Sequence, residues 1–259
     1  MANKPKRLSA ATYERVLAIG SPVLLLVVWE ALVWAKVLDA RFVPAPSTIF
    51  VAGWQMILSG ELWEHVRASL LRLAAGFVVG VVPGIAIGLV MGLNRYVRAA
   101  LDPLVAATFP VPKIAILPLL MLAFGIGEAS KVAVIAIAVI YLALINTMLG
   151  VMTLDRVYFE VARNYGAPWR KLFTRVIIPG ALPHIFAGLR LSLGVSLIVI
   201  VSAEFVAAKS GIGYLIWTSW ESLVIEKMFV GIIVITLLGV VFNAVLKEVE
   251  HLCIPWRNE

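Results

Sequence analysis

The sequence contains little charge and few of the side chains that bind metals or perform covalent chemistry. Charged residues make up 14% of the 259 residues, and the chain has one cysteine and three histidines. The single cysteine, Cys253, excludes an intrachain disulfide and a paired-cysteine zinc or redox site. The histidines at positions 65, 184 and 251 are far apart, without metal-ligand spacing. We therefore expect no metal site in this chain.

Two patterns that would indicate nucleotide or nucleic-acid binding are also missing. No G-x4-G-K-[ST] phosphate-binding loop occurs in the chain, so ATP hydrolysis linked to its function is expected on another polypeptide. No basic patch with interleaved aromatic residues is present that would favour DNA or RNA. The net charge of +7 is interpreted instead as loop charge set by membrane topology.

Apolar residues are in excess, and they are gathered in long runs. They make up 62% of the chain, with a mean hydropathy of +0.99, whereas soluble domains contain about 45–50%. Crossing a bilayer takes about 20 apolar residues in a helix. The sequence therefore predicts an all-α polytopic membrane protein with about six transmembrane helices. The expected spans are residues 16–37, 72–93, 101–124, 131–151, 185–208 and 228–246.

An even number of spans places both chain ends on one side of the membrane. The tails and loops on that side carry more lysine and arginine than the opposite loops, which favours the cytoplasm for both termini and for residues 152–184. We expect a cytoplasmic tail over residues 1–15, one transmembrane domain over residues 16–251 and a second cytoplasmic tail over residues 252–259. The first apolar block exceeds the about 7–15 residues of a signal peptide.

Two segments are expected to lie at the outer membrane surface. Residues 48–58 form an amphipathic stretch that is too short to span, with Ser47 as the expected N-cap of a helix. Residues 209–226 are expected to form an outer loop. Its aromatic side chains would belong to an interfacial belt: Tyr214, Trp217 and Trp220.

Glycine recurs at every fourth position of the second span. The residues are Gly76, Gly80, Gly84, Gly88 and Gly92. Each glycine weakens an isolated helix by about 1 kcal/mol relative to alanine. A stripe of them therefore predicts that another helix backbone packs closely there, a structural role that we prefer to ligand binding. Pro83 in the same span predicts a local bend.

Prolines interrupt the third span, residues 101–124. They are Pro103, Pro110, Pro112 and Pro118, and together they exclude one regular helix. Broken backbone at membrane depth is tolerated only against protein or a water-filled cavity. This segment is therefore the first candidate for a translocation path.

Three charged side chains within the expected spans are further candidates for the path: Lys113, Glu204 and Arg190. A charge at the bilayer centre costs about 2.5–3.5 kcal/mol on insertion scales, so each requires a reason to be there. The two cations would suit an anionic solute. The alternatives are structural: Lys113 contacts anionic lipid, Glu204 holds the outer loop or pairs with Lys209, and Arg190 snorkels to the interface. Glu30 is expected to face the outer interface or a neighbouring helix.

Residues 160–179, EVARNYGAPWRKLFTRVIIP, form a polar and basic stretch between two spans. Gly166 suits the C-terminal cap of a short helix, and Pro168 suits the first turn of the next helix. We therefore expect a cytoplasmic loop folded as a helix, a turn and a second helix.

The spacing in this loop is similar to the EAA-x3-G-x9-I-x-L-P motif of permease subunits of binding-protein-dependent ABC importers. The matching positions are Glu160, Ala162, Gly166, Val176, Ile178 and Pro179. Valine at 161 replaces the first alanine of the motif, and valine and isoleucine at 176 and 178 replace its isoleucine and leucine. Residues 109–128, FPVPKIAILPLLMLAFGIGE, also resemble the branch that serves nitrate, sulfonate and taurine uptake.

This resemblance implies a type I ABC importer permease in the bacterial inner membrane. The loop around residues 157–165 would be the coupling helix that docks on a separate ATPase. The implied coupling residues are Glu160, Ala162, Arg163, Gly166, Ala167 and Arg170. The implied partners are ATPase subunits, which carry ATP and Mg, an external solute-binding protein and a second permease copy, expected as a homodimer. This chain itself would bind no cofactor and no nucleic acid, and it would not be an enzyme.

Two other function classes compete with this interpretation. An ion-coupled secondary transporter would need an inverted repeat and paired intramembrane carboxylates, and Glu30 and Glu204 do not lie in repeated contexts. An intramembrane enzyme would need a Ser–His pair or a metal cluster, and neither is evident. The solute stays open between nitrate, alkyl sulfonates, taurine and pyrimidine or aromatic acids, because an external binding protein would set the selectivity.

Overall fold

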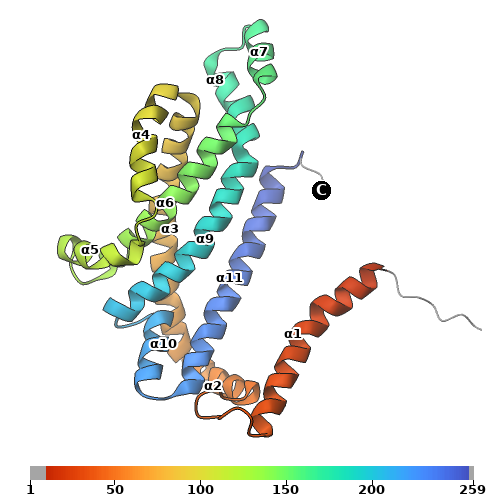
Figure 1. The fold of residues 1–259 in the computed structure, drawn as a ribbon, viewed down its shortest axis with the longest axis vertical. Helices are drawn as coiled ribbons and strands as arrows, with labels where there is room; N and C mark the ends of the chain where they lie inside the picture. The colour runs from red at the N-terminus through yellow and green to blue at the C-terminus, as the bar shows by residue number, and fades with distance from the viewer. Residues whose placement is uncertain (1–9, 257–259) are drawn as a thin grey trace, which may run out of the picture.

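The computed structural model describes residues 10–256, and these residues form helices and short connections without a β-strand. The predicted basic tail thus lies largely outside the described residues, as do residues 257–259. Figure 1 shows the helices as an elongated bundle. In chain order they are α1 (Ala10–Trp34), α2 (Pro46–Leu58), α3 (Glu61–Leu93), α4 (Arg95–Thr108), a 3-10 turn (Lys113–Ile116), α5 (Leu117–Phe124), α6 (Glu128–Met152), α7 (Arg156–Asn164), α8 (Trp169–Leu172), a π turn (Phe173–Ile177), α9 (Ile178–Ala207), α10 (Ile212–Glu221) and α11 (Ile225–Cys253).

Three long helices, α3, α6 and α9, form the centre of the bundle. Their shared core is apolar and includes Leu73, Ile135, Val139 and Ile200, all of which are buried. The helix α6 lies between the other two and is buried along most of its length. This central position explains why its sequence is apolar all round and carries small residues where its neighbours approach.

The glycine stripe of α3 lies against α6. A Cβ atom added at Gly84 would lie 2.7 Å from the backbone oxygen of Ile140, and one at Gly88 would lie 2.5 Å from that of Leu144. Gly76, Gly80 and Gly92 also face α6 at contact distance. The two backbones therefore approach so closely that no side chain fits between them. The helix continues through Pro83 as one element.

Five of the six predicted spans correspond to apolar helical segments of the structure that could cross a membrane, one of them as a bent pair. Four helical segments are long and apolar enough to cross a bilayer: Glu61–Leu93, Glu128–Met152, Trp169–Val206 and Ile225–Cys253. As the prolines predicted, the third span is broken. Its two parts, Arg95–Thr108 and Lys113–Phe124, are bent by 88° and count together as a possible fifth crossing. For α1, the apolar part is the shorter stretch Gly20–Trp34, so a sixth span stays a prediction.

Several predicted boundaries were wrong. The helix of the second span begins at Glu61 instead of residue 72, about three turns earlier. Its first turn contains Glu61 and Glu64, where acidic side chains are favourable. Ser47 does not cap α2, whose N-cap is Ala45 with proline at the first position. The Ser47 hydroxyl donates instead to Glu30 Oε1 at 2.7 Å, so Glu30 does face a neighbouring helix.

The segment expected as an outer loop is the helix α10, packed against α9 and α11. Four residues in helical spacing are buried there: Ile212, Leu215, Ile216 and Ser219. The two tryptophans of α10 are more exposed, at 38% for Trp217 and 52% for Trp220. Trp217 packs on Phe205 and Trp220, and the interfacial belt stays a prediction. The helix α10 closes one end of the bundle, next to α2, and α7 and α8 lie at the opposite end (Figure 1).

Candidate coupling surface and buried charge network

A helix–turn–helix protrudes at one end of the bundle, formed by α7 and α8 (Figure 1). Asp155 caps α7 by accepting a hydrogen bond from the Val157 amide at 3.0 Å. At the other end, Gly166 has a φ of +63°. The Gly166 amide donates to the Arg163 carbonyl at 3.0 Å and the Ala167 amide to the Ala162 carbonyl at 2.9 Å. These two bonds form a Schellman cap, which favours glycine at this position.

The outward face of α7 and α8 is exposed and has polar side chains without partners. Glu160, Arg163 and Arg170 are exposed, and their side chains make no hydrogen bond or ion pair with any other residue in the range 10–256. Two apolar side chains lie beside them: Tyr165 is 87% exposed and Val161 is 48% exposed. A mixed apolar and charged surface on a short rigid helix is typical of a protein interface.

The inward face of the same segment is anchored in the bundle. Phe159, Leu172 and Phe173 pack against a buried cluster that includes Val151 of α6 and Ile177. The π turn and α9 continue from α8 without a break, as one apolar segment. A displacement of α7 would therefore be transmitted to α6 and α9, because well-packed side chains move together.

Lys113 lies at the break between α4 and α5. Its ammonium group donates to three backbone carbonyls, those of Thr108 at 2.8 Å, Phe109 at 2.9 Å and Val111 at 2.9 Å. It also lies 4.4 Å from the ring centroid of Tyr141 on α6. Lys113 thus satisfies the carbonyls freed where α4 ends, and its charge stabilises the broken segment.

Glu204 of α9 forms the centre of a buried charge network at the α10 end. Its side chain has 0% exposure, and Oε1 accepts from Arg72 Nη1 at 2.7 Å. The Ser69 hydroxyl donates to it at 2.8 Å and the Gly213 amide at 2.8 Å. The predicted alternative that Glu204 pairs with Lys209 was wrong, because Arg72 occupies that role from α3.

Arg72 connects this network to further elements. Besides Glu204, its guanidinium donates to both carboxylate oxygens of Glu128 at the start of α6 and to the Ser210 carbonyl at 2.6 Å. One side chain thus joins α3, α6, α9 and the segment that leads into α10. Neither Arg72 nor Glu128 was predicted as a site residue, because Arg72 was the first residue of an expected span and Glu128 lay in the connection between two expected spans. The acidic residues in the first turns of α3 and α6 were the signal that could have revealed them, because such residues are favourable where a helix begins.

Arg190 lies far from this network along α9. Its Nη2 atom donates to Glu250 Oε2 of α11 at 2.6 Å. Lys113, Glu204 and Arg190 therefore lie in three different places, each with a partner. The structure does not bring them together, and their role in a translocation path stays a prediction.

Among residues 10–256, no group of three or more His, Cys, Asp or Glu side chains is arranged to hold a metal ion. The features that stand out are the exposed α7–α8 surface at one end and the buried network at the other. Both are joined by the same helices, α6 and α9.

Comparison with known proteins explains this arrangement. Residues 84–251 match the family described as "Binding-protein-dependent transport system inner membrane component". The chain belongs to this family. It is an integral membrane protein, the permease component of an ABC importer, as the motif around Glu160 predicted. The matched range includes the broken third span, the α7–α8 surface and Glu204.

Relatives of this permease are similar over nearly their whole length. A protein named putative aliphatic sulfonates transport permease protein SsuC, from Bacillus subtilis, is 35% identical over 92% of this chain and 86% of its own length. The taurine transport system permease protein TauC of Escherichia coli is 34% identical, over 94% and 90%. The nitrate import permease protein NrtB of Synechocystis is 30% identical, over 89% and 86%. These relatives support the importer interpretation and not an ion-coupled transporter.

Proposed function

We propose that this permease moves a small anionic solute, of the sulfonate, taurine or nitrate type, and that a separate ATPase drives it through α7. The observation that carries the proposal is the α7–α8 surface: it is exposed, it holds charged side chains without partners, and it is anchored on α6 and α9. Permeases named for sulfonate, taurine and nitrate are similar to the chain, which supports the solute class.

In this proposal Glu160, Arg163 and Arg170 make polar contacts with the ATPase. Ala162 and Ala167, both half-buried, allow close approach, and Gly166 fixes the turn. ATP and Mg would bind to the ATPase and not to this chain. Closure of the ATPase dimer would displace α7, and the rigid contacts of Phe159 with the cluster around Ile177 would pass the motion to α9.

The proposed assembly contains two copies of the permease and an external solute-binding protein that delivers the solute. The helix α1 supports a second copy, because most of it leaves the body of the bundle (Figure 1). Its last turns pack against α2, and Trp29 packs on Phe229 of α11. Its apolar side chains, such as Leu24 and Leu25, are exposed. Lys113 stays the proposed path residue, since it lies at the broken segment and carries positive charge. The cytoplasmic side is proposed for α7 and both termini.

The solute class can be tested by deleting the permease from its native cell. We expect the deletion strain to lose uptake of labelled taurine, ethanesulfonate or nitrate, and to lose growth on that anion as the sole sulfur or nitrogen source. Growth on sulfate and ammonium should be unchanged. Wild-type chain should restore uptake, and a Glu160→Lys variant should not, because the reversed charge lies on the docking surface. Loss of uptake for neutral or cationic solutes alone would contradict the proposed class.

A further inference from the structure

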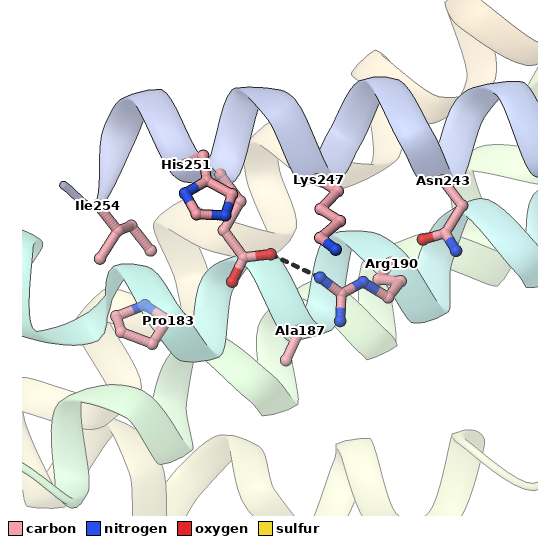
Figure 2. A pocket seen from close by; sticks show the side chains of 8 residues that line it. Pro183, Ala187, Arg190, Asn243, Lys247, His251 and Ile254 are labelled. Carbon is pink, nitrogen blue, oxygen red and sulfur yellow. Dashed lines mark hydrogen bonds and ion pairs between the residues drawn. The ribbon is translucent and has the colours of Figure 1, made fainter. Parts of the chain in front are cut away.

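A polar groove lies between α9 and α11, and neither the coupling surface nor the buried network uses it. It has a volume of about 470 Å³. Figure 2 shows Arg190 and Ala187 on α9 and Asn243, Lys247 and His251 on α11. Glu250 of α11 also lines the groove. The positions on each helix follow helical spacing, so two facing stripes form the walls. The small side chain of Ala187 leaves the space between them open.

The groove carries more positive than negative charge. Arg190 shares its charge with Glu250 through the 2.6 Å ion pair. Lys247 and Asn243 both lie on the groove wall, yet no hydrogen bond or ion pair joins either side chain to another residue between positions 10 and 256. The three ammonium protons of Lys247 and the amide of Asn243 are therefore available as donors. An oxyanion is the group that satisfies such donors best.

The two cations of the groove lie at one membrane level. In α9, Arg190 lies five residues into the expected span 185–208, close enough to its start for the guanidinium to reach the interface, and in α11 Lys247 directly follows the apolar run of residues 228–246. The contact of Arg190 with Glu250 shows that the first half of α9 lies beside the last turns of α11. Both cations therefore mark the same boundary, where the hydrocarbon of a bilayer ends and its headgroups begin.

The surface of α11 next to the groove is suited to acyl chains. Val240, Val241 and Val245 are all more than half exposed, in the turns before Lys247. A ligand bound beside them meets apolar side chains on the membrane side and positive charge at the boundary. This combination matches a phospholipid better than a small soluble anion, because a soluble anion has no group to cover the valines.

We propose that this groove binds an anionic phospholipid, with its headgroup phosphate held by Lys247, Asn243 and the free N–H groups of Arg190. The phosphate oxygens accept the hydrogen bonds, and one acyl chain lies along the exposed valines of α11. Glu250 orients Arg190 and also repels the anion, so the groove keeps a limited positive charge. The bound lipid fills the space between α9 and α11 near the α7 end.

The test uses the full chain, purified in detergent and stripped of lipid, with dioleoylphosphatidylglycerol and dioleoylphosphatidylcholine as probes in native mass spectrometry. Wild type should retain phosphatidylglycerol in preference to phosphatidylcholine. Lys247→Gln should weaken phosphatidylglycerol binding about fivefold, the contribution of one lysine near an anionic surface. Lys36→Gln makes the same charge change on an exposed side chain at the other end of the molecule, and it should bind like wild type.

A second variant tests the sign of the electrostatics. Glu250→Gln removes the negative charge from the groove and should strengthen phosphatidylglycerol binding. Lys247 has no partner among the described residues, so Lys247→Gln should keep the thermal midpoint of wild type. Weaker lipid binding by this variant would then result from the change in the groove and not from unfolding. Equal retention of the two lipids by wild type, or unchanged binding by Lys247→Gln, would overturn the proposal. Binding of inorganic phosphate or ethanesulfonate that displaces phosphatidylglycerol at equal concentration would overturn the lipid assignment.

Discussion

Replacing Arg72 with methionine is expected to lower the free energy of unfolding by about 3–5 kcal/mol, the cost of removing one partner from a buried ion pair. Glu204 would stay buried without its cation, because its side chain has 0% exposure and Arg72 has 4%. Glu128 and the Ser210 carbonyl would lose the same partner. The effect should appear as a large fall in the thermal midpoint of the purified chain, measured by fluorescence-detected size-exclusion chromatography.

The matched control is the partly exposed ion pair between Lys227 and Glu61, whose side chains are 37% and 36% exposed. Lys227→Met should cost about 1 kcal/mol or less, as exposed pairs do. The double variant Arg72→Met with Glu204→Met should recover part of the loss, since no unpaired buried charge remains. If the double variant loses as much as the two single variants added together, Arg72 and Glu204 are not coupled and the network does not hold this end of the bundle.

Adding a single methyl group at Gly88 is expected to destabilise the bundle by about 1–3 kcal/mol, the usual cost of overpacking. The new Cβ of Gly88→Ala would lie 2.5 Å from the Leu144 backbone oxygen and 2.8 Å from Thr147 Cβ. A helix backbone cannot yield as a flexible side chain can, so α3 would have to move away from α6. Gly88→Val should prevent accumulation of folded chain. The yield and thermal midpoint of the detergent-purified protein measure both effects.

Gly194→Ala provides the control within the same membrane region. Gly194 lies in α9, and a Cβ added there meets nothing within 4 Å. This substitution should be neutral or slightly stabilising, because alanine favours the helix by about 1 kcal/mol. An equal loss of stability in both variants would contradict close packing of α3 on α6 and would point to a general intolerance of alanine in these helices.

Apolar runs and the positions of proline and glycine in the sequence predicted much of the fold. Apolar runs located the long helices, because a bilayer requires about 20 apolar residues in each crossing helix. The prolines between 103 and 118 predicted the broken span, and the glycines of α3 predicted a close helix contact whose partner, α6, only the structure could name. Gly166 predicted the turn after α7, since its positive φ disfavours other residues.

Features that depend on tertiary contacts were harder to predict from the sequence. The sequence predicted an outer loop over residues 209–226, whereas the structure has the helix α10 there, with Ile212 and Leu215 buried against other helices. Arg72 and Glu128 lie far apart in the sequence and become partners only when α3 and α6 pack. The motif indicated candidate coupling residues on α7, and their role stays a prediction. It did not indicate that Phe159 packs the helix against the bundle.

Site-specific crosslinking can show whether α7 docks on the ATPase. Cys253, the only cysteine of the chain, is replaced by serine, and one new cysteine is placed on α7 as Val161→Cys or in the α1–α2 connection as Phe42→Cys. Both parent side chains are exposed, at 48% and 66%. A thiol–amine crosslinker is then applied to membranes that contain the working transporter. We expect an adduct with the ATPase from position 161, identified by peptide mass spectrometry, and none from position 42. An ATPase adduct from position 42 with none from position 161, in membranes that still transport, would show that coupling does not pass through α7.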